Sequence, residues 1–388
     1  MTGRYKSATV IGTRPAQRKR IMTATLTRRG FVTGSLTGAA CLSVAGCSAG
    51  GTAYDAALAE LTLPLPASPD LHELVRYASM AANGHNTQPW TFLPRKDGVD
   101  ILPDFARRTP VVDPDDHHLF ASLGCAAENM SQAAKARGMS GEAHFTPEGD
   151  GGVRVELTPG AREETALLAA IPARQCSRST YNGKPVPADI LRRLELAAKI
   201  EGVEPVFITG NKQAETILNL VVAGNSRQLD DPAFLAELKS WIRFDANAAA
   251  KARDGLYTAA SGNPSAPSWL GSIVFDLLFS KQAENDKYAE QIRSSSGLVV
   301  FVASSNDKQG WVAAGRAYQR FALQATVDGL KHAFLNQAVE VPSVRRDLQA
   351  LLSLGERRPD FVVRFGYGPA MPKSLRRKPS DVIAVAAA

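Results

Sequence analysis

Two stretches far apart in the chain repeat one pattern. Gly124 and Gly138 frame the first stretch, and Gly315 and Gly329 frame the second with the same spacing. The first stretch also carries alanine pairs two helical turns apart, which leave room for another helix to pack closely: Ala126, Ala127, Ala133 and Ala134. The second stretch therefore looks like a copy of the first, and a long helix is predicted in each.

The charge of the chain is concentrated at its start. Of the 388 residues, 44% are hydrophobic and 21% charged, and no run of 18 apolar residues occurs, which excludes a polytopic membrane protein. Eight of the 45 Lys and Arg residues, but no Asp or Glu, lie in residues 1–46, so the remainder holds 37 basic against 38 acidic side chains. A body so close to neutral has no general attraction for nucleic acid.

The first part of the chain has the composition of an export signal. Arg28 and Arg29 stand just before a mildly apolar stretch at 31–46 that is rich in Gly, Thr, Ser and Ala. The paired arginines resemble a twin-arginine (Tat) signal, so we expect export by that route. The alternative is a polar turn followed by a short buried helix. Met22 lies close before the arginines, so the true start is either Met1 or Met22.

The segment Val44-Ala45-Gly46-Cys47 resembles a lipobox, in which small residues precede the cysteine that accepts a diacylglyceryl group. We therefore expect a signal with a lipobox at 1–47 and lipidation of Cys47. Acyl chains on Cys47 would tether the protein to a membrane, on its periplasmic or cell-surface side. The alternative is an ordinary signal with an incidental cysteine.

The body begins with a predicted helix, loop and strand. Apolar residues at helical spacing predict a helix over 71–82, and Asn83-Gly84 follows as a typical C-terminal cap. A polar loop leads to a strand at 91–93. Further elements are predicted as a helix with its body at 119–138, a helix at 191–198 and a strand within 358–368.

Two motifs resemble the nitroreductase superfamily of FMN-dependent oxidoreductases. The segment 81–92, A-A-N-G-H-N-T-Q-P-W-T-F, is similar to the family's A-P-S-x-x-N-x-Q-P-W-x-F unit. The segment 174–178, R-Q-C-S-R, with Tyr181 and Val186 after it, is similar to the family's R-R-S-x-R-x-F…V opening. Ala82 and Cys176 depart from the family's Pro and Ser. The resemblance implies an α+β, nitroreductase-like fold.

The two motifs are divided between the halves of the chain. Residues 53–165 hold the N-x-Q-P-W loop without the arginine motif, and residues 166–388 hold the arginine motif without that loop. Nitroreductases are normally homodimers whose FMN lies between subunits. The resemblance thus implies a fused pseudo-dimer with one composite FMN site, similar to the Acg-type single-chain branch. A monomer would suffice for that site.

The resemblance assigns roles to site residues on both halves. Arg174, together with Arg376, Arg377 or Lys378, would bind the FMN phosphate, because an arginine fork bonds two phosphate oxygens at once. Arg178 would lie near N1/O2 of the flavin, where negative charge develops on reduction. Cys176 stands where the family uses a hydroxyl on the phosphate or ribityl chain, and a thiol is a weaker donor. From the other half the flavin contacts would be Asn83, Gly84 and Asn86. The alternative for the arginines is surface ion pairing.

The expected function is an exported flavin oxidoreductase that needs no catalytic acid or base. NAD(P)H or another donor would reduce the flavin, and an acceptor such as a nitroaromatic or quinone would reoxidise it. A flavin-binding or flavin-sequestering protein without steady turnover is the alternative. A third reading is a degenerate fold without flavin, which serves as a lipid-anchored scaffold.

Two further features each allow two readings. The segment 244–275 is either a lid over the cofactor or a helical hairpin packed elsewhere. His117 and His118 follow acidic residues in a pattern that suggests a metal site. Adjacent histidines on a helix are expected to point apart, however, and Asp113, Asp115 and Asp116 suit a helix start, so we expect no metal there.

Overall fold

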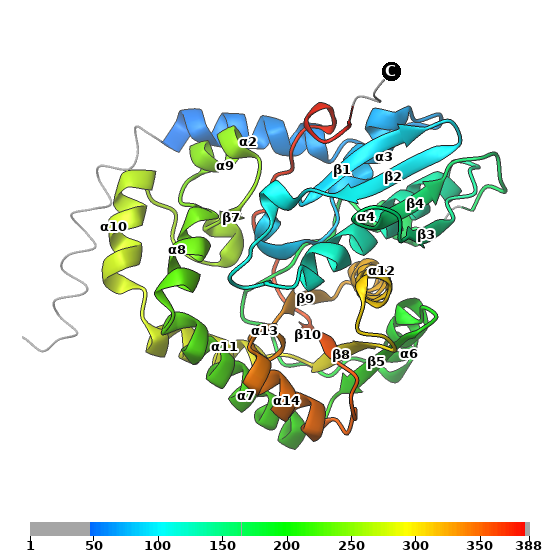
Figure 1. Cartoon of the computed structure of the whole chain (residues 1–388). Helices are drawn as coiled ribbons and strands as arrows, with labels where there is room; N and C mark the ends of the chain where they lie inside the picture. The colour runs from blue at the N-terminus through cyan, green and yellow to red at the C-terminus, as the bar shows by residue number, and fades with distance from the viewer. Residues whose placement is uncertain (1–46, 164, 385–388) are drawn as a thin grey trace, which may run out of the picture. The chain divides into compact units, whose positions relative to one another are not determined.

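The computed structural model describes residues 47–163 and 165–384 (Figure 1). The predicted Tat signal, with Arg28 and Arg29, lies outside the described residues. Helix α2 (Cys47–Leu61) begins at the predicted lipidation site. None of the described helices is long and apolar enough to cross a membrane.

The first half folds around a four-stranded antiparallel sheet with the strand order β1-β2-β4-β3. Its elements, in chain order, are α3 (Leu71–Ser79), β1 (Trp90–Arg95), β2 (Gly98–Pro103), α4 (His117–Lys135), β3 (Ala143–Thr146) and β4 (Gly152–Glu156). Alternate strand residues such as Phe92, Ile101 and Val153 are fully buried in the same apolar cluster as Leu123 of α4. This period-two burial gives the sheet one face in the core, against α4.

The second half repeats this arrangement. Its sheet is also antiparallel, in the order β5-β8-β10-β9. Its corresponding elements are α6 (Ala188–Ala198), β5 (Val203–Ile208), β8 (Gly297–Ala303), α12 (Lys308–Val327), β9 (Lys331–Phe334) and β10 (Pro359–Gly366). In both sheets the long helix joins the second strand to the third, and the fourth strand lies between those two. The two halves therefore share one strand order and one connectivity.

The second sheet is buried on both faces. All seven residues of β8 and all eight of β10 are buried. Val299 and Phe301 of β8 face the cluster shared with α12, whereas Val300 and Val302 face a second cluster. That second face is covered by α7 (Asn211–Leu229), α13 (Gln337–Glu340) and α14 (Pro342–Leu351). A strand that is covered on both faces reads as a continuous apolar run, as Leu-Val-Val-Phe-Val does here.

The chain between β5 and β8 contains additional helices. After α7 come α8 (Pro232–Ser240), β6 (Ile242–Arg243), α9 (Ala246–Ala252), β7 (Leu256–Tyr257), α10 (Ser268–Leu278) and α11 (Lys281–Arg293). In Figure 1, α8, α9 and α10 lie to one side of the two sheets, whereas α11 lies beside α7, and its Ile292 joins the apolar cluster of the second sheet. A short helix, α5 (Ala166–Ala170), precedes the arginine motif.

The end of the second half crosses to the sheet of the first half, whereas the arginine motif stays beside its own sheet. The C-terminal segment returns to the first sheet, where Phe92 N–H donates to Val382 O at 2.8 Å and Ala384 N–H donates to Phe92 O at 2.8 Å. The arginine motif lies along β9, and Ser177 N–H donates to His332 O at 2.9 Å.

The helices α4 and α12 cross at the two glycines that open the repeated pattern. A Cβ at Gly124 would lie 2.1 Å from Val312 O, and a Cβ at Gly315 would lie 1.9 Å from Ala121 O. Each glycine thus meets the carbonyl oxygen three residues before the other glycine. The contact is reciprocal, as in a two-fold interface. Gly138 and Gly329, which close the pattern, have positive φ angles of 79° and 73° after their helices end.

Most expected elements are present, but two helices end earlier than predicted. The helix body predicted at 119–138 ends at Lys135. The predicted 71–82 helix ends at Ser79, and Asn83-Gly84 is not its C-cap. Instead Gly84 begins a 3-10 turn over Gly84–Asn86. Asn83 Oδ1 accepts the Gln88 N–H, and this hydrogen bond joins the two ends of the loop that contains the turn. The antiparallel sheets and their helices agree with the expected α+β class.

Replacing Gly315 by alanine should destabilise the fold. The new methyl group would overlap the Ala121 carbonyl, so α4 and α12 would have to separate. We expect the free energy of unfolding to fall by roughly 1–3 kcal/mol, measured by urea denaturation. Gly51→Ala in α2 is the control, because no atom lies within 4 Å of its new Cβ. Equal stability of the two variants would contradict the close crossing.

Candidate functional site

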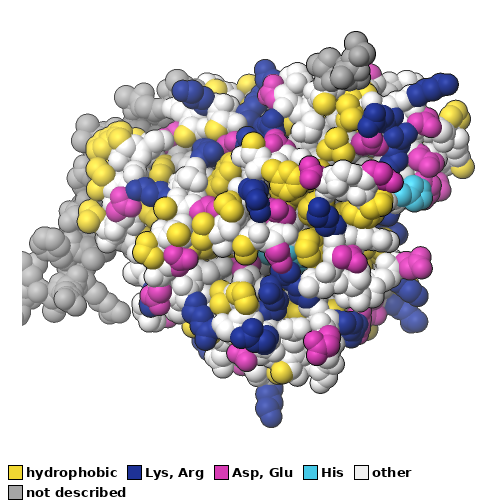
Figure 2. Space-filling model, in the orientation of Figure 1, with side chains coloured by type: hydrophobic (Ala, Val, Ile, Leu, Met, Phe, Trp, Pro, Cys, Tyr) yellow, Lys and Arg dark blue, Asp and Glu magenta, His cyan; other side chains and the backbone are white. Residues whose placement is uncertain are grey.

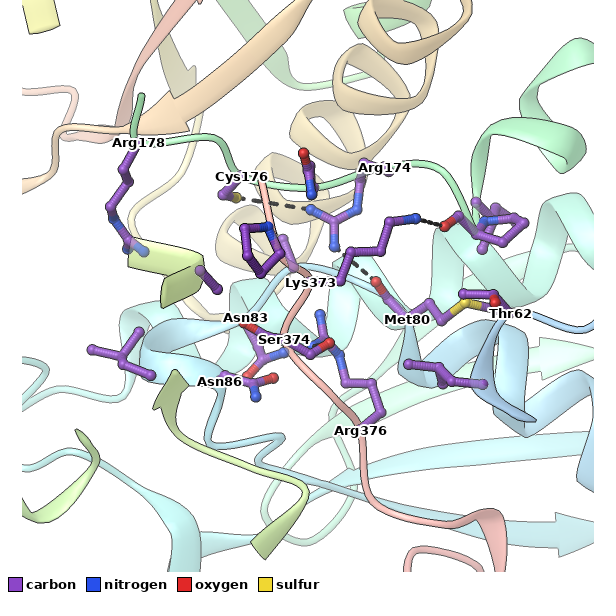
Figure 3. Close-up of a pocket in the computed structure, with 18 of the residues that line it drawn as sticks. Thr62, Met80, Asn83, Asn86, Arg174, Cys176, Arg178, Lys373, Ser374 and Arg376 are labelled. Carbon is purple, nitrogen blue, oxygen red and sulfur yellow. Dashed lines mark hydrogen bonds between the residues drawn. The ribbon is translucent and has the colours of Figure 1, made fainter. Parts of the chain in front are cut away.

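The two predicted motifs meet at one small cavity of about 100 Å³ (Figure 3). Asn83 and Asn86 line it from the first half, and Arg174, Cys176 and Arg178 line it from the second. The C-terminal segment adds Lys373, Ser374 and Arg376. Figure 3 shows Arg174 and Lys373 near one another, with Asn86 and Arg376 on the opposite side, and the Lys373 ammonium donates to Pro172 O. Three segments distant in sequence therefore form one site.

The Asn loop has a strained backbone. His85, Asn86 and Gln88 have φ angles of 46°, 54° and 54°, which residues other than glycine rarely adopt. Hydrogen bonds stabilise this backbone conformation, since Asn86 Nδ2 donates to Gly255 O at 3.0 Å and to Leu375 O at 3.1 Å. Gln88 Nε2 donates to Arg253 O at 2.8 Å. Strained, over-determined loops of this kind are concentrated at functional sites.

These contacts change the expected role of Asn86. Its amide group is committed to the fold, and only its buried Oδ1 has no hydrogen-bond partner among the described residues. Asn83 Oδ1 likewise holds Gln88 N–H at 2.8 Å. Gly84 lies on the wall of an adjoining larger cavity, and a Cβ there would meet no atom within 4 Å. Gly84 is therefore not required by packing.

Arg174 and Cys176 lie on the side of the cavity formed by the second half. Arg174 is buried, and its Nη2 donates to Met80 O at 2.8 Å, across to the end of α3. Its Nη1 lies 3.8 Å from Cys176 Sγ. Cys176 Sγ in turn lies 3.6 Å from the Tyr318 hydroxyl of α12. The Arg174 Nε has no partner among the described residues, so this guanidinium retains a free donor.

Arg178 is held in place by a buried arginine that the sequence did not single out. Arg364 of β10 is fully buried, and its guanidinium lies 3.9 Å from the centre of the Tyr181 ring. It donates to Ser177 O at 2.9 Å and to Ser179 O at 2.7 Å, the carbonyls on either side of Arg178. Its other terminal nitrogen donates to Gln291 O at 3.0 Å. Arg364 is therefore a positioning residue for the Arg178 backbone.

The cavity collects positive charge without a balancing carboxylate. Four cationic side chains line it, Arg174, Arg178, Lys373 and Arg376, and none of the described lining residues is Asp or Glu. Burial, with the charge of Arg174 nearby, lowers the pKa of Lys373 to about 8 and that of Arg376 to about 9. Such uncompensated cations favour an anionic ligand.

Of the three predicted C-terminal cations, only Arg376 lines the cavity. Its Nε donates to Ser79 O at 2.8 Å and its Nη2 to Ala81 O at 3.1 Å, which ties the C-terminal segment to the end of α3. Arg377 turns away, because its Nη2 donates to Asp381 O at 2.6 Å. Lys378 is exposed. Lys373 lines the cavity instead of Arg377 and Lys378. It lies in the same basic stretch of the sequence, and that stretch was the signal that could have identified it.

A larger cavity of about 540 Å³ adjoins the small one. Asn83, His85 and Arg178 line both cavities, so they stand at the junction. The walls of the larger cavity include aromatic rings from the inserted segment, Phe244, Phe275 and Phe279. Much of the 244–275 segment thus borders this space, beside the small cavity. Whether it opens and closes as a lid stays a prediction.

His85 stands at this junction as a neutral ring. Burial lowers its pKa to about 4, with a further contribution from the charge of Arg178. Its Nδ1 has no partner among the described residues. The imidazole can therefore donate or accept one hydrogen bond to a molecule in either cavity.

The histidine pair of α4 differs from expectation in one respect. The rings of His117 and His118 are 4.7 Å apart, so the expectation that they point apart was wrong; both rings stack on Phe361. Donor atoms of these two residues and Asp113 lie within 4.8 Å of one another. Asp113 accepts the His118 and Leu119 N–H groups, each at 3.0 Å, as a helix cap. His117 Nε2 bonds to Asp360 Oδ1 at 2.8 Å. These contacts give Asp113 and His117 a structural role.

Comparisons with known proteins agree with the motif resemblance. No protein-family profile matches the chain. Two Mycobacterium tuberculosis proteins, named "Putative NAD(P)H nitroreductase Rv3131" and "Putative NAD(P)H nitroreductase MT3217", are each 23% identical to it over 341 residues. Each alignment covers 84% of this chain and 94% of the relative. This similarity supports the resemblance to the nitroreductase superfamily.

Solved structures with similarity to the chain include two nitroreductases. One is a nitroreductase with bound FMN from Desulfitobacterium hafniense, with a TM-score of 0.36, 11% identity, and coverage of 58% of this chain and 100% of that one. The other is the FMN-dependent nitroreductase NfnB from Mycobacterium smegmatis in complex with NADPH, with a TM-score of 0.34, 14% identity, and coverage of 52% and 87%.

Replacing Arg364 by methionine should cost much of the stability of the second half. The substitution leaves the carbonyls of Ser177, Ser179 and Gln291 without this donor in a buried site. We expect the free energy of unfolding to fall by roughly 3 kcal/mol or more, measured by urea denaturation. Arg193→Met is the control, because that side chain is 46% exposed and solvent screens its ion pairs, which should contribute little to stability. A similar small loss in both variants would contradict the role of Arg364.

Proposed function

We propose that the chain is an FMN-dependent oxidoreductase of the nitroreductase type, with one flavin site built from both halves. The observation that carries this proposal is the meeting of Asn83, Asn86, Arg174 and Arg178 at one cationic cavity. Either motif alone is a short pattern that chance could supply. Their convergence from distant parts of the chain, on a space that favours an anion, supports a shared ligand.

The residues present fit the phosphate end of FMN. Arg174 retains an unpartnered buried Nε, and Lys373 and Arg376 bring two further charges with no carboxylate in the described lining. Arg174, Lys373 and Arg376 would hold the phosphate. Asn86 Oδ1, buried and unpartnered, can accept a hydrogen bond from the ligand. The small cavity cannot enclose the whole cofactor, so the ring would extend toward the larger cavity past Arg178.

FMN, when bound, supplies the two-electron chemistry, accepting a hydride from one molecule and passing it to another. Arg178 lies at the junction of the two cavities, where its charge would stabilise negative charge that develops during reduction. The larger cavity, with its aromatic walls, would exclude water and hold the donor and acceptor in turn. NAD(P)H is the donor that the names of the relatives suggest, and a nitroaromatic or quinone is the expected acceptor.

Gene fusion of two nitroreductase-type halves accounts for the internal repeat. The identical strand order of the two sheets and the reciprocal glycine contacts support a pseudo-dimer, divided near residues 53–165 and 166–388. Each half has kept one of the two motifs that a site needs. One chain would therefore suffice for one flavin site, as in the Acg-type branch.

Export through the twin-arginine route, with a lipid anchor on Cys47, is also part of the proposal. Arg28, Arg29 and the lipobox sequence before Cys47 support it. That route suits a protein that folds around a cofactor before export. It would place the flavin on the periplasmic or cell-surface side, where the electron donor has to differ from the cytoplasmic NAD(P)H pool.

A flavin store without turnover is the second candidate function. The large cavity beside the proposed flavin site favours turnover, because a store needs no room for a second molecule. Stable FMN binding without reoxidation by any acceptor would instead support the store.

Replacing Arg178 by alanine tests the proposed site. We expect FMN affinity, measured by fluorescence quenching, to fall at least about tenfold, because a charged donor to the cofactor is lost. NADPH oxidation with a quinone or nitroaromatic acceptor should fall with it. Lys378→Ala is the matched control, since this exposed cation lies outside the cavity and should leave both unchanged. Equal FMN affinity in both variants would contradict the proposed site.

The pH dependence of FMN affinity should report on Lys373. In the free protein this lysine has a pKa of about 8, below its ordinary 10.5, and a bound phosphate would raise it. Affinity should thus stay level between about pH 7, where the phosphate is largely dianionic, and pH 8, and then fall, by up to about tenfold per pH unit, as the free lysine loses its proton. Lys373→Met should bind more weakly, without this fall. An identical pH profile in the variant would contradict the assignment.

A further inference from the structure

Helix α10 presents an apolar face to solvent. Its exposed side chains follow one helical stripe: Trp269, Leu270, Ile273, Val274 and Leu277. Trp269 is 68% exposed and Leu277 is 76% exposed. The other exposed large apolar side chains of the described residues are spread singly over the chain: Leu63, Val111, Leu196 and Val327. Figure 2 shows hydrophobic side chains gathered at the left edge, over α10.

We propose that this face of α10 lies in the surface of the lipid bilayer that carries the predicted anchor. The proposal rests on the anchoring of Cys47 proposed above. It adds a second contact, which would fix the orientation of the body on the membrane. The predicted diacylglyceryl anchor already carries two acyl chains, so the second contact would orient the body rather than supply the affinity for the membrane.

The part of α2 that packs on the body and helix α10 belong to one set of packed elements. Tyr54 of α2 follows Cys47 by only seven residues in the sequence, so the tether between the proposed anchor and the body would be short. Tyr54 and Ala57 of α2 pack with Ala249 of α9. The start of α9 is joined to the start of α10, because Ser268 Oγ donates to Asp245 Oδ2 at 2.7 Å. Contacts thus run from the anchored helix to α10.

The contact would be apolar rather than electrostatic. Lys239 pairs with Asp276 at 2.6 Å, and Lys281 pairs with Asp230 at 2.6 Å, so the cations next to α10 are already neutralised. A short amphipathic helix with a tryptophan on its apolar face is typical of an interfacial membrane contact. Because these lysines are paired with carboxylates, they do not provide a basic surface for binding anionic lipid headgroups.

The same helix borders the larger cavity. Gly271, Val274 and Phe275 line it, and Val274 belongs to the exposed face as well. An acceptor that dissolves in the bilayer would therefore meet α10 before it reaches the cavity. The membrane contact and the access to the proposed active site would share one helix.

Fluorescence quenching by brominated lipids tests this contact. The full chain carries Cys47→Ser, which removes the acylation site, and is mixed with phosphatidylethanolamine and phosphatidylglycerol vesicles that contain brominated acyl chains. We expect vesicle-dependent quenching that Trp269→Phe largely removes and that about 0.5 M NaCl leaves in place. The triple variant Leu270→Ser, Ile273→Ser, Leu277→Ser keeps the Trp269 probe and should partition roughly tenfold more weakly.

The control for the quenching experiment removes exposed apolar side chains that lie outside α10. Leu63→Ser with Leu196→Ser removes two exposed apolar side chains elsewhere and should leave the quenching unchanged. Equal quenching in the triple variant, or in Trp269→Phe, would overturn the proposal, since another segment would then bind the vesicles. A lipid-free dimer that the triple variant converts to a monomer, without quenching in the parent, would assign the face to a second copy. FMN binding of each variant, measured in parallel, tests the proposed function separately.

Discussion

The close crossing of α4 and α12 is the contact on which the site depends. Gly124 and Gly315 let the two helix backbones meet, and α12 then reaches both motifs with adjacent residues. The Tyr318 hydroxyl lies 3.6 Å from Cys176 Sγ, while Gln319 Oε1 accepts the Ala82 N–H at 3.3 Å, just before the Asn loop. A larger residue at either glycine would separate the halves and, with them, the two sides of the cavity.

The site itself opposes stability. Buried cations gather without carboxylates, and three residues of the Asn loop keep left-handed backbone angles. The surrounding structure compensates by binding backbone groups: Arg376 and Arg174 donate to carbonyls at the end of α3, and Arg364 donates to the carbonyls beside Arg178. An anionic ligand would relieve the repulsion among the cations, so ligand binding and folding should support each other.

The sequence predicted the repeated helices and the late strand, for which glycine spacing and apolar runs are local signals. The meeting of the two motifs was implied by the resemblance to nitroreductases and not by a local signal. It did not predict Lys373 or Arg364. Lys373 lies beside Arg174 only because the C-terminal segment crosses to the first sheet, and Arg364 lies in an apolar strand whose burial is set by distant helices. The sequence also grouped Arg377 and Lys378 with Arg376, although Arg377 donates to Asp381 O and Lys378 is exposed. Such assignments need the tertiary fold.

The central claim is that one chain builds one flavin site from both halves. The most direct measurement is the flavin content of the purified full chain after incubation with FMN, from visible absorbance, together with the mass of the complex from light scattering. The proposed arrangement predicts one FMN per chain, in a particle as small as a monomer. Two FMN per chain, one FMN per two chains, or no bound FMN would each contradict it.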